Sequence, residues 1–521
     1  MKCPRLHALA ALVLVAIGSF RIASTWRVFN HTIDEPDNLA AGMEYLSTGK
    51  YRYEDTHPPL ARVFAAVGPY LAGERFRPGP EAYGEGYRIL GHGAHYDRTL
   101  ALGRAGILPF FWIASAVVFL WALRVRGPAA AVAATLLFTT LPPVLAHAGV
   151  TTTDTALCAM TGAAGLASLY WADLPSRRRS VAFGALLGLA CLSKFSALVF
   201  LPAAWSVMCA CSLAMARRGP RWLAREAWNR KRAIALVLGT ACLAIWAAYG
   251  FSFARVEFFH LRMPAPRFFS GIHSVWTHNR LGHSSYLLGR RSPDGFWYYF
   301  PVVLAIKTPL GLLLLLGLAP VFLRRSKRPS GVPLALAFSA GILLISLTGR
   351  IDIGSRFVLP VYVGVCVACA SAAAEARGRF ARIAAVLLIA WHVTSGAWQH
   401  PDYLAYTNEI AGRHPENFLA DSDLDWGQDM KRLGAFLAQA GATNLTFTPF
   451  NRTYAMAGHP LPPMTPGDTG HPTPGWNAVS ITIWKVFGFP AWADRIPPQN
   501  RIGRSILVWY FLPDDAGRPV W

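Results

Sequence analysis

Long apolar runs separated by short basic segments fill roughly the first 400 residues of this chain. A bilayer core requires about 20 apolar residues per helix. The runs that reach or approach this length are 6–26, 104–123, 128–147, 153–172, 233–252, 297–321, 331–348, 356–374 and 383–398. A hydrophobic share of 53% with only 15% charged residues agrees with them and excludes the composition of a soluble domain. The sequence therefore predicts an α-helical polytopic membrane protein.

The run 180–214 is too long for one crossing, since it holds 35 residues. Its single charge, Lys194, lies near the middle, and arginines flank both ends, at 177–179 and again from 217 to 232. Basic residues mark cytoplasmic loops, so both ends are expected inside. The run then crosses twice, with Lys194 at the turn on the outer side. This gives about eleven spans.

The charge of the chain indicates its orientation. A net charge of +22 in a soluble protein would suggest nucleic acid as a partner. With a cytoplasmic N-terminus, however, the predicted inside segments alone account for +18. Those segments are 1–5, 124–127, 173–180, 215–232, 322–330 and 375–382. We therefore expect a lipid bilayer and no nucleic acid around this chain, which is placed in the cell inner or plasma membrane.

Two parts are expected, a transmembrane module at 1–399 and an extracytoplasmic α/β domain at 400–521. The module has external loops at 27–103 and 253–296. Within the first loop, 57–73 is apolar but too short to span and carries Arg62, which favours an interfacial helix. The polar tail predicts a helix and three strands, at 427–440, 445–450, 478–484 and 505–511.

Asp34 and Glu35 directly follow the first span. Paired carboxylates at a membrane surface can act as a general base, hold a metal ion, or favour the start of a helix near Pro36. His57 precedes two prolines in a rigid turn, where a histidine is usually solvated or caps a helix. The sequence alone leaves these alternatives open.

Asp154 and Lys194 lie at the outer ends of predicted spans. Aspartate at such a position commonly caps a helix by accepting free backbone amides. A lysine at the membrane boundary either extends to the lipid headgroups or binds a phosphate as a compact charge. Ionisable residues at this depth are candidates for function.

Three later features also carry polar groups. The loop 273–299 gathers His278, His283 and Arg290 among aromatic residues that could simply form an interfacial belt. The loop 349–357 holds Arg356. The segment 421–433 opens with the D-x-D-x-D spacing of a calcium loop but lacks its glycine and terminal glutamate, so helix capping by Asp425 is favoured.

The acidic pair followed by a Pro-Pro-Leu motif resembles the first external loop of polyprenyl-phosphate-sugar-dependent glycosyltransferases with the GT-C fold. This superfamily includes protein O-mannosyltransferases and the aminoarabinose transferases acting on lipid A. Its bacterial members are also similar at Thr152 and Asp154, and at 192–198, 292–310 and 422–433. His57 stands where the aminoarabinose branch often has lysine.

The resemblance implies a sugar donor joined through one phosphate to a polyprenyl chain, and a lipid, glycan or protein acceptor. Asp34 is then the general base for an inverting displacement, and Glu35 orients it or contacts the acceptor. Lys194 and Arg356 neutralise the departing phosphate, while Asp154 and His57 position the donor head. His278, His283 and Arg290 form a possible substrate loop. No cofactor is certain, and a divalent metal is possible without being indicated by ligand spacing.

The alternative is a polytopic transporter or flippase of lipid-linked sugars. Such a protein predicts internal repeats and ionisable residues near the middle of its spans. The sequence shows no repeat of useful period, and the predicted polar groups lie at the outer ends, apart from Lys307 near the middle of one run. The transferase is therefore favoured over the transporter, and over an inactive scaffold that binds a cell-wall partner.

Overall fold

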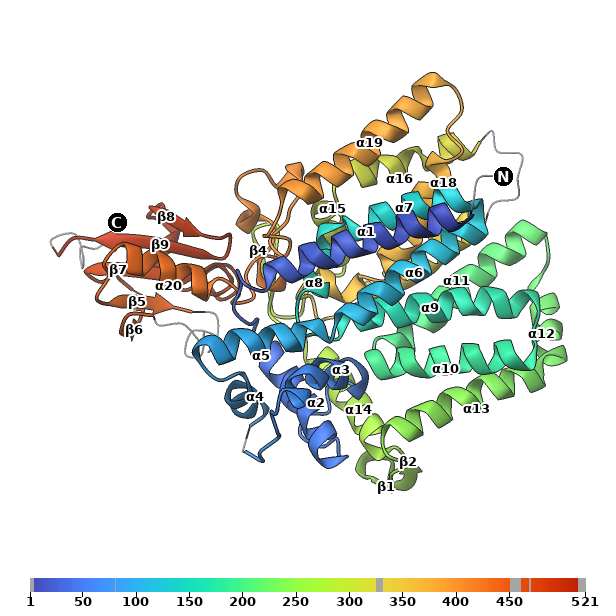
Figure 1. Cartoon of the computed structure of the whole chain (residues 1–521), viewed down its shortest axis with the longest axis horizontal. Helices are drawn as coiled ribbons and strands as arrows, with labels where there is room; N and C mark the ends of the chain where they lie inside the picture. Colours follow the sequence, from blue (N-terminus) through green and yellow to red (C-terminus); the bar gives the residue numbers. More distant parts are fainter. Residues whose placement is uncertain (1–3, 80, 325–330, 450–460, 468–469, 514–521) are drawn as a thin grey trace.

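The computed structural model describes residues 4–79, 81–324, 331–449, 461–467 and 470–513. Helices dominate it, and a small sheet forms near the C-terminus, so the predicted fold class is confirmed (Figure 1). The bundle comprises α1 (Pro4–Thr25), α6 (Leu108–Arg126), α7 (Pro128–Thr139), α8 (Pro142–Ala148), α9 (Asp154–Asp173), α10 (Arg177–Ser193), α11 (Ala197–Ala216), α13 (Lys231–Ala248), α15 (Tyr299–Lys307), α16 (Leu310–Leu323), α17 (Val332–Ser346), α18 (Val361–Ala373) and α19 (Arg379–Trp398).

Fewer helices meet the length of a span than the eleven expected. Five stretches of the described chain are long and apolar enough to cross a membrane, or up to seven if each of two bent helix pairs counts as one span. The shortfall arises partly because α17 and α18 have only 15 and 13 residues. The chain is a multi-pass membrane protein, but length and composition do not establish eleven crossings.

The segments predicted on opposite sides of the membrane lie at opposite ends of the bundle (Figure 1). The start of α1 and the connecting helix α12 (Pro220–Asn229) share one end. The other end carries the C-terminal sheet and the helices of the first loop, which are α2 (Glu35–Thr48), α3 (Pro59–Leu71), α4 (Ala82–Leu90) and α5 (Gly93–Ala105). Helix α3 occupies the stretch predicted as an interfacial helix.

The break predicted at Lys194 is present, because α10 ends at Ser193 and α11 begins at Ala197. Close packing then holds the helices together, as two glycines illustrate. A Cβ atom at Gly364 of α18 would lie 2.0 Å from the carbonyl oxygen of Ala335 in α17. One at Gly341 would lie 2.5 Å from the Cα of Ala204. Small residues at these crossings let the backbones approach, as in other membrane bundles.

The predicted single span 297–321 is instead two helices, α15 and α16, that meet at 109°. Pro309 lacks the N–H that a continuous helix would use there. The Asn408 side chain supplies the missing donors, to the carbonyls of Ala305 at 2.6 Å and Thr308 at 2.8 Å. The run 128–147 is likewise broken, with α7 and α8 at 65°.

Lys307 therefore lies at a helix break rather than in the middle of a span. Its Nζ donates hydrogen bonds to the carbonyls of Leu404 and Asp423, each at 2.6 Å. The polar tail thus supplies hydrogen-bond acceptors for the Lys307 ammonium. Lys307 was the residue that most favoured a transporter, and these bonds give it a structural role instead.

The C-terminal sheet has the strand order β6-β5-β7-β9-β8. Its elements are α20 (Met430–Gln439), β5 (Leu445–Thr448), β6 (Met464–Pro466), β7 (Gly475–Ser480), β8 (Asn500–Ile502) and β9 (Ile506–Phe511). β5 is parallel to β6 and β7, whereas β9 is antiparallel to β7 and β8. The last residue of the predicted strand 445–450 lies outside the described residues.

Two expectations about the tail are wrong for one reason. The strand predicted at 478–484 stops at Ser480, and Asp425 does not cap α20, which begins at Met430 after Asp429. Instead the Asp425 carboxylate accepts hydrogen bonds from the Ser480 hydroxyl and from the Thr482 amide, the latter at 3.1 Å. This interaction draws the chain out of the sheet after Ser480.

Candidate active site

A cavity of about 490 Å³ lies where the first loop, the bundle and the tail meet. Its lining comes from segments far apart in the sequence: 33–38, 54–62, 194–196, 275–283 and 351–357, with Tyr83, Asp421, Trp426 and Phe487. Six of the nine predicted site residues line it, namely Asp34, His57, Lys194, His278, His283 and Arg356. The fold thus brings together side chains that no local spacing joins.

Four charged side chains of alternating sign form a chain along one wall. Arg356 Nη1 donates to Asp34 Oδ2 at 2.7 Å and lies 3.8 Å from Asp154 Oδ2. Lys194 Nζ donates to Asp154 Oδ1 at 2.6 Å. Asp154 and Lys194 are buried, whereas the Asp34 side chain is 31% exposed. Of the two acids in this chain of charges, Asp34 is therefore the one that a substrate in the cavity can reach.

These contacts argue against two of the alternatives that the sequence left open, helix capping by the acids and extension of Lys194 to the lipid headgroups. Asp34 precedes α2 and Asp154 begins α9, yet neither helix start has a side-chain cap hydrogen bond within the described structure. Lys194 is only 4% exposed and pairs with Asp154, so it does not extend to the lipid headgroups. Each acid has one carboxylate oxygen hydrogen-bonded to a cation rather than to a backbone amide.

The wall retains free hydrogen-bonding capacity. Arg356 Nε and Asp154 Oδ2 are buried atoms for which the described residues supply no hydrogen-bond partner. Such atoms are rare in folded proteins. The Arg356 guanidinium also lies 4.1 Å from the Trp426 ring centroid, and Lys194 Nζ lies 3.9 Å from that of Phe357. Two positioned cations, one with an unused donor, suit an anion with several oxygens.

A second ion cluster forms the floor beside Asp34. The buried Arg62 donates through Nη2 to Asp37 Oδ2 at 3.0 Å and to Glu54 Oε2 at 3.1 Å. Its Nη1 donates to the Tyr51 hydroxyl at 3.0 Å. Burial raises the pKa of Asp37 to about 7. The predicted list omitted Asp37, although it follows Asp34 by three residues and so shares its helix face.

Two further groups in the cavity have shifted proton affinities. Burial, reinforced by the nearby cations Arg62 and Lys194, lowers the pKa of His57 well below its ordinary value. His57 is therefore neutral at pH 7 and can both donate and accept a hydrogen bond. Burial raises the pKa of Asp421 to about 7 despite the opposing effect of Arg356.

Two predicted site residues lie elsewhere. Glu35 is 1% exposed and accepts from Arg104, whose Nη2 lies 3.0 Å from Glu35 Oε1. Arg104 also donates to the carbonyl of Asn30 at 2.8 Å. Glu35 points away from Asp34 because adjacent helical residues face different directions. Arg290 lies in β4 (Arg290–Ser292) and is exposed, outside the cavity lining.

An apolar cavity of about 310 Å³ adjoins the charged one. The two share the lining residues Phe195, Ser196, Val275, Ile351 and Phe357. The apolar lining continues along α11, α14 (Pro266–Leu281) and α17. A single ligand with a charged head and a hydrocarbon tail can therefore occupy both spaces.

The acidic segment of the tail supports the charged wall from behind. Asp423 accepts hydrogen bonds from the Ser355 amide at 3.0 Å and from its hydroxyl at 2.7 Å. Ser355 directly precedes Arg356, so Asp423 fixes the backbone that presents the guanidinium. Within the described part of the chain, no group of three or more His, Cys, Asp or Glu side chains is close enough to hold a metal ion.

A comparison with protein-family models and with curated sequences returns no match. Solved structures do match. ArnT from Cupriavidus metallidurans bound to undecaprenyl phosphate is 15% identical, with a TM-score of 0.52 over 95% of this chain and 97% of that chain. The apo state of that protein gives 14% identity and a TM-score of 0.51 over the same shares.

The oligosaccharyltransferase of Archaeoglobus fulgidus gives 13% identity and a TM-score of 0.46, over 93% of this chain and 72% of that one. The present chain has the fold of ArnT. The GT-C fold implied by the sequence motifs is thereby confirmed.

Proposed function

We propose that this protein is a membrane glycosyltransferase that moves a sugar from a polyprenyl-phosphate carrier to a hydroxyl of an envelope acceptor. The observation that carries the proposal is the charged chain from Asp34 to Lys194 at the junction of a polar and an apolar cavity. The fold supports this proposal, because ArnT has the same fold and has been solved with undecaprenyl phosphate bound.

The donor fits the two cavities in one orientation. Its phosphate lies against Lys194 and Arg356, where the unused Arg356 Nε supplies a donor. The first isoprene units enter the apolar cavity beyond Phe195 and Phe357. The sugar then lies in the charged cavity, where neutral His57 can bond its hydroxyls, and His278 and His283 line the same space.

The reaction is an inverting displacement. Asp34 accepts the proton of the acceptor hydroxyl, whose oxygen bonds to the anomeric carbon. The bond between that carbon and the phosphate oxygen breaks, and its electron pair leaves with the polyprenyl phosphate. Lys194 and Arg356 stabilise the negative charge that grows on the phosphate. When the phosphate engages Arg356, this residue releases Asp34 to act as the base.

The remaining predicted residues take indirect roles in this proposal. Glu35 fixes the approach to α2 through Arg104 rather than touching the acceptor. Arg290 contacts substrate only at the edge of the loop 253–296, which borders the cavity. The module 1–399 holds the donor, and the tail 400–521 lies on the outer face with the N-terminus in the cytoplasm.

The experiment is sugar transfer by the purified protein from a labelled polyprenyl-phosphate sugar. Asp34→Asn is expected to lower the transfer rate by about 10²–10⁴-fold. The matched control is Asp173→Asn, which removes an exposed carboxylate at the far end of α9. Transfer by Asp34→Asn at the parent rate would overturn the general-base role.

A flippase gives a different result in the same material. Reconstituted protein would then move the labelled donor across the bilayer without forming a glycosylated product. Neither the parent protein nor Asp34→Asn would form product. Product that depends on Asp34 selects the transferase.

A further inference from the structure

A second cavity, of about 880 Å³, is lined by the start of the segment 51–57, whose later residues line the candidate active site. Among the described residues, the two cavities have no lining residue in common. The walls of the second one are the end of α2 with the loop after it, α14, and the hairpin of β1 (Phe253–Val256) and β2 (Leu261–Pro264). Its volume lies within the usual range for a small-molecule site.

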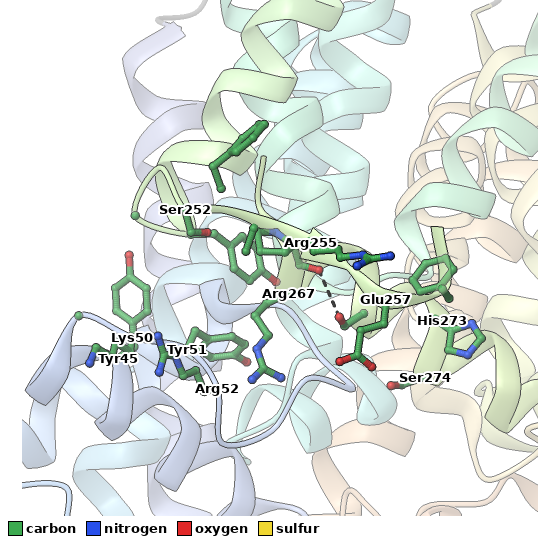
Figure 2. A pocket seen from close by; sticks show the side chains of 18 residues that line it. Tyr45, Lys50, Tyr51, Arg52, Ser252, Arg255, Glu257, Arg267, His273 and Ser274 are labelled. Atoms are coloured by element: carbon green, nitrogen blue, oxygen red, sulfur yellow. Dashed lines mark hydrogen bonds between the residues drawn. The ribbon is translucent and has the colours of Figure 1, made fainter. Parts of the chain in front are cut away.

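The lining of this cavity is strongly basic. Lys50, Arg52, Arg255 and Arg267 surround it, and Glu257 is the single acid of its lining. Figure 2 shows Arg52 and Arg267 entering the space from different walls, with Glu257 beside them. All four cations are exposed. Like charges brought together around a concave surface attract an anion.

These four cations also have no carboxylate partner among the described residues. In the described structure no acidic side chain forms an ion pair with Lys50, Arg52 or Arg267, and the nearest recorded polar partner of Arg255 is His260 at 3.5 Å. The candidate active site differs, since every cation there already has a carboxylate partner. Free guanidinium groups bind phosphate oxygens in a two-pronged geometry.

The position of the cavity indicates where its anion comes from. The hairpin directly follows α13, one of the candidate membrane spans. Its apolar side chains are exposed: Phe251 by 56%, Phe253 by 53%, Phe259 by 49% and Leu261 by 62%. Exposed apolar side chains at the end of a span, beside basic ones, are typical of a segment that contacts the membrane interface. The basic cavity therefore opens at the depth of the lipid headgroups.

We propose that this cavity binds the phosphate of an acidic membrane lipid. Arg52 and Arg267 hold the phosphate, and the exposed phenyl rings of the hairpin lie along the acyl chains. The hydroxyl groups of Tyr45 and Ser252, which also line the cavity, can bond the rest of the headgroup. This site does not depend on the proposed transfer reaction, since it is built from different residues.

The test uses the full-length protein in a neutral detergent, with dioctanoyl phosphatidylglycerol as the probe. Native mass spectrometry and the shift in melting temperature with lipid concentration give the affinity. The expected result is saturable binding to the parent protein. Arg52→Gln/Arg267→Gln is expected to weaken it at least about tenfold, because two charge-assisted hydrogen-bond donors are lost.

The matched control is Arg221→Gln/Arg225→Gln, which removes two exposed arginines from α12 at the opposite end of the bundle. Equal affinity of the two double variants would overturn the site, and so would equal binding of dioctanoyl phosphatidylcholine by the parent. A third probe, glycerol 3-phosphate, distinguishes the source of the anion. If it bound as tightly as the lipid, the anion site would stand and its assignment to membrane lipid would be wrong.

Discussion

The two polar cavities of this protein use charge in opposite ways. In the candidate active site, Lys194 and Arg356 are buried and each already faces a carboxylate. In the cavity beside the hairpin, Lys50, Arg52 and Arg267 are exposed, and no carboxylate of the described residues forms an ion pair with them. Buried, paired charges are held in one geometry, which suits the stabilisation of a transition state. Exposed, unpaired charges exchange their anions readily, which suits the binding of an abundant lipid.

The comparison is tested first by stability. Arg62→Met leaves the buried Asp37 and the partly buried Glu54 without their cation, so the free energy of unfolding is expected to fall by about 3–5 kcal/mol. Arg52→Met in the basic cavity removes an exposed arginine and is expected to change it by less than about 0.5 kcal/mol. Chemical denaturation in detergent measures both. An equal decrease in the free energy of unfolding for the two variants would show that the charges of the two cavities contribute equally to stability.

Lys194→Ala is expected to lower the rate of sugar transfer by about 10²–10³-fold, because one of two cations facing the departing phosphate is removed. Single-turnover assays with saturating donor measure the effect. Lys231→Ala, at the start of α13 in the opposite end of the bundle, serves as the control. A Lys194→Ala enzyme with the parent rate would remove the lysine from the mechanism.

Arg356→Lys is expected to cost about tenfold in transfer rate, which is 1.4 kcal/mol. The substitution preserves the charge but removes the planar fork that reaches Asp34 and a phosphate together. The loss should fall on turnover more than on the donor KM if the fork acts on the transition state. A change confined to KM would instead assign Arg356 to ground-state binding.

Asp421→Asn is expected to alter the pH dependence of stability by at most about 1.4 kcal/mol per pH unit. Burial raises the pKa of Asp421 to about 7, so the folded protein binds this proton more tightly than the unfolded chain does. That contribution is fully present below about pH 4 and is lost as the pH rises through 7. The stability of the parent relative to Asp421→Asn should therefore decline over this window.

The sequence predicted that most of the candidate site residues lie on one side of the bundle, but not how their charges pair. Basic residues at both ends of 180–214 placed the turn at Lys194, and the same rule assigned Asp34 and Arg356 to the same side. The pairing of Lys194 with Asp154 depends on the rotation of α9 and α10 about their axes. No spacing in the sequence determines that rotation.

The errors arose where distant segments compete for the same polar group. A helix cap at Asp425 was predicted in preference to a calcium loop, but the Asp425 carboxylate instead accepts hydrogen bonds from Ser480 and Thr482. Glu35 was grouped with Asp34 because they are adjacent, although Arg104 draws it into the core. The proline itself is a sequence signal for the helix break at Pro309. No sequence pattern indicates that Asn408 stabilises this break.

The helix break at 307–309 also constrains the order in which parts of the protein can fold during synthesis. Its polar groups bond to Leu404, Asn408 and Asp423, which leave the ribosome about one hundred residues later. Until then, the Lys307 ammonium and two backbone carbonyls have none of these partners at the membrane. The bundle therefore completes its folding only after the first part of the tail, through Asp423, has been synthesised. A nascent chain arrested near residue 399 should remain sensitive to membrane proteases that the finished protein resists.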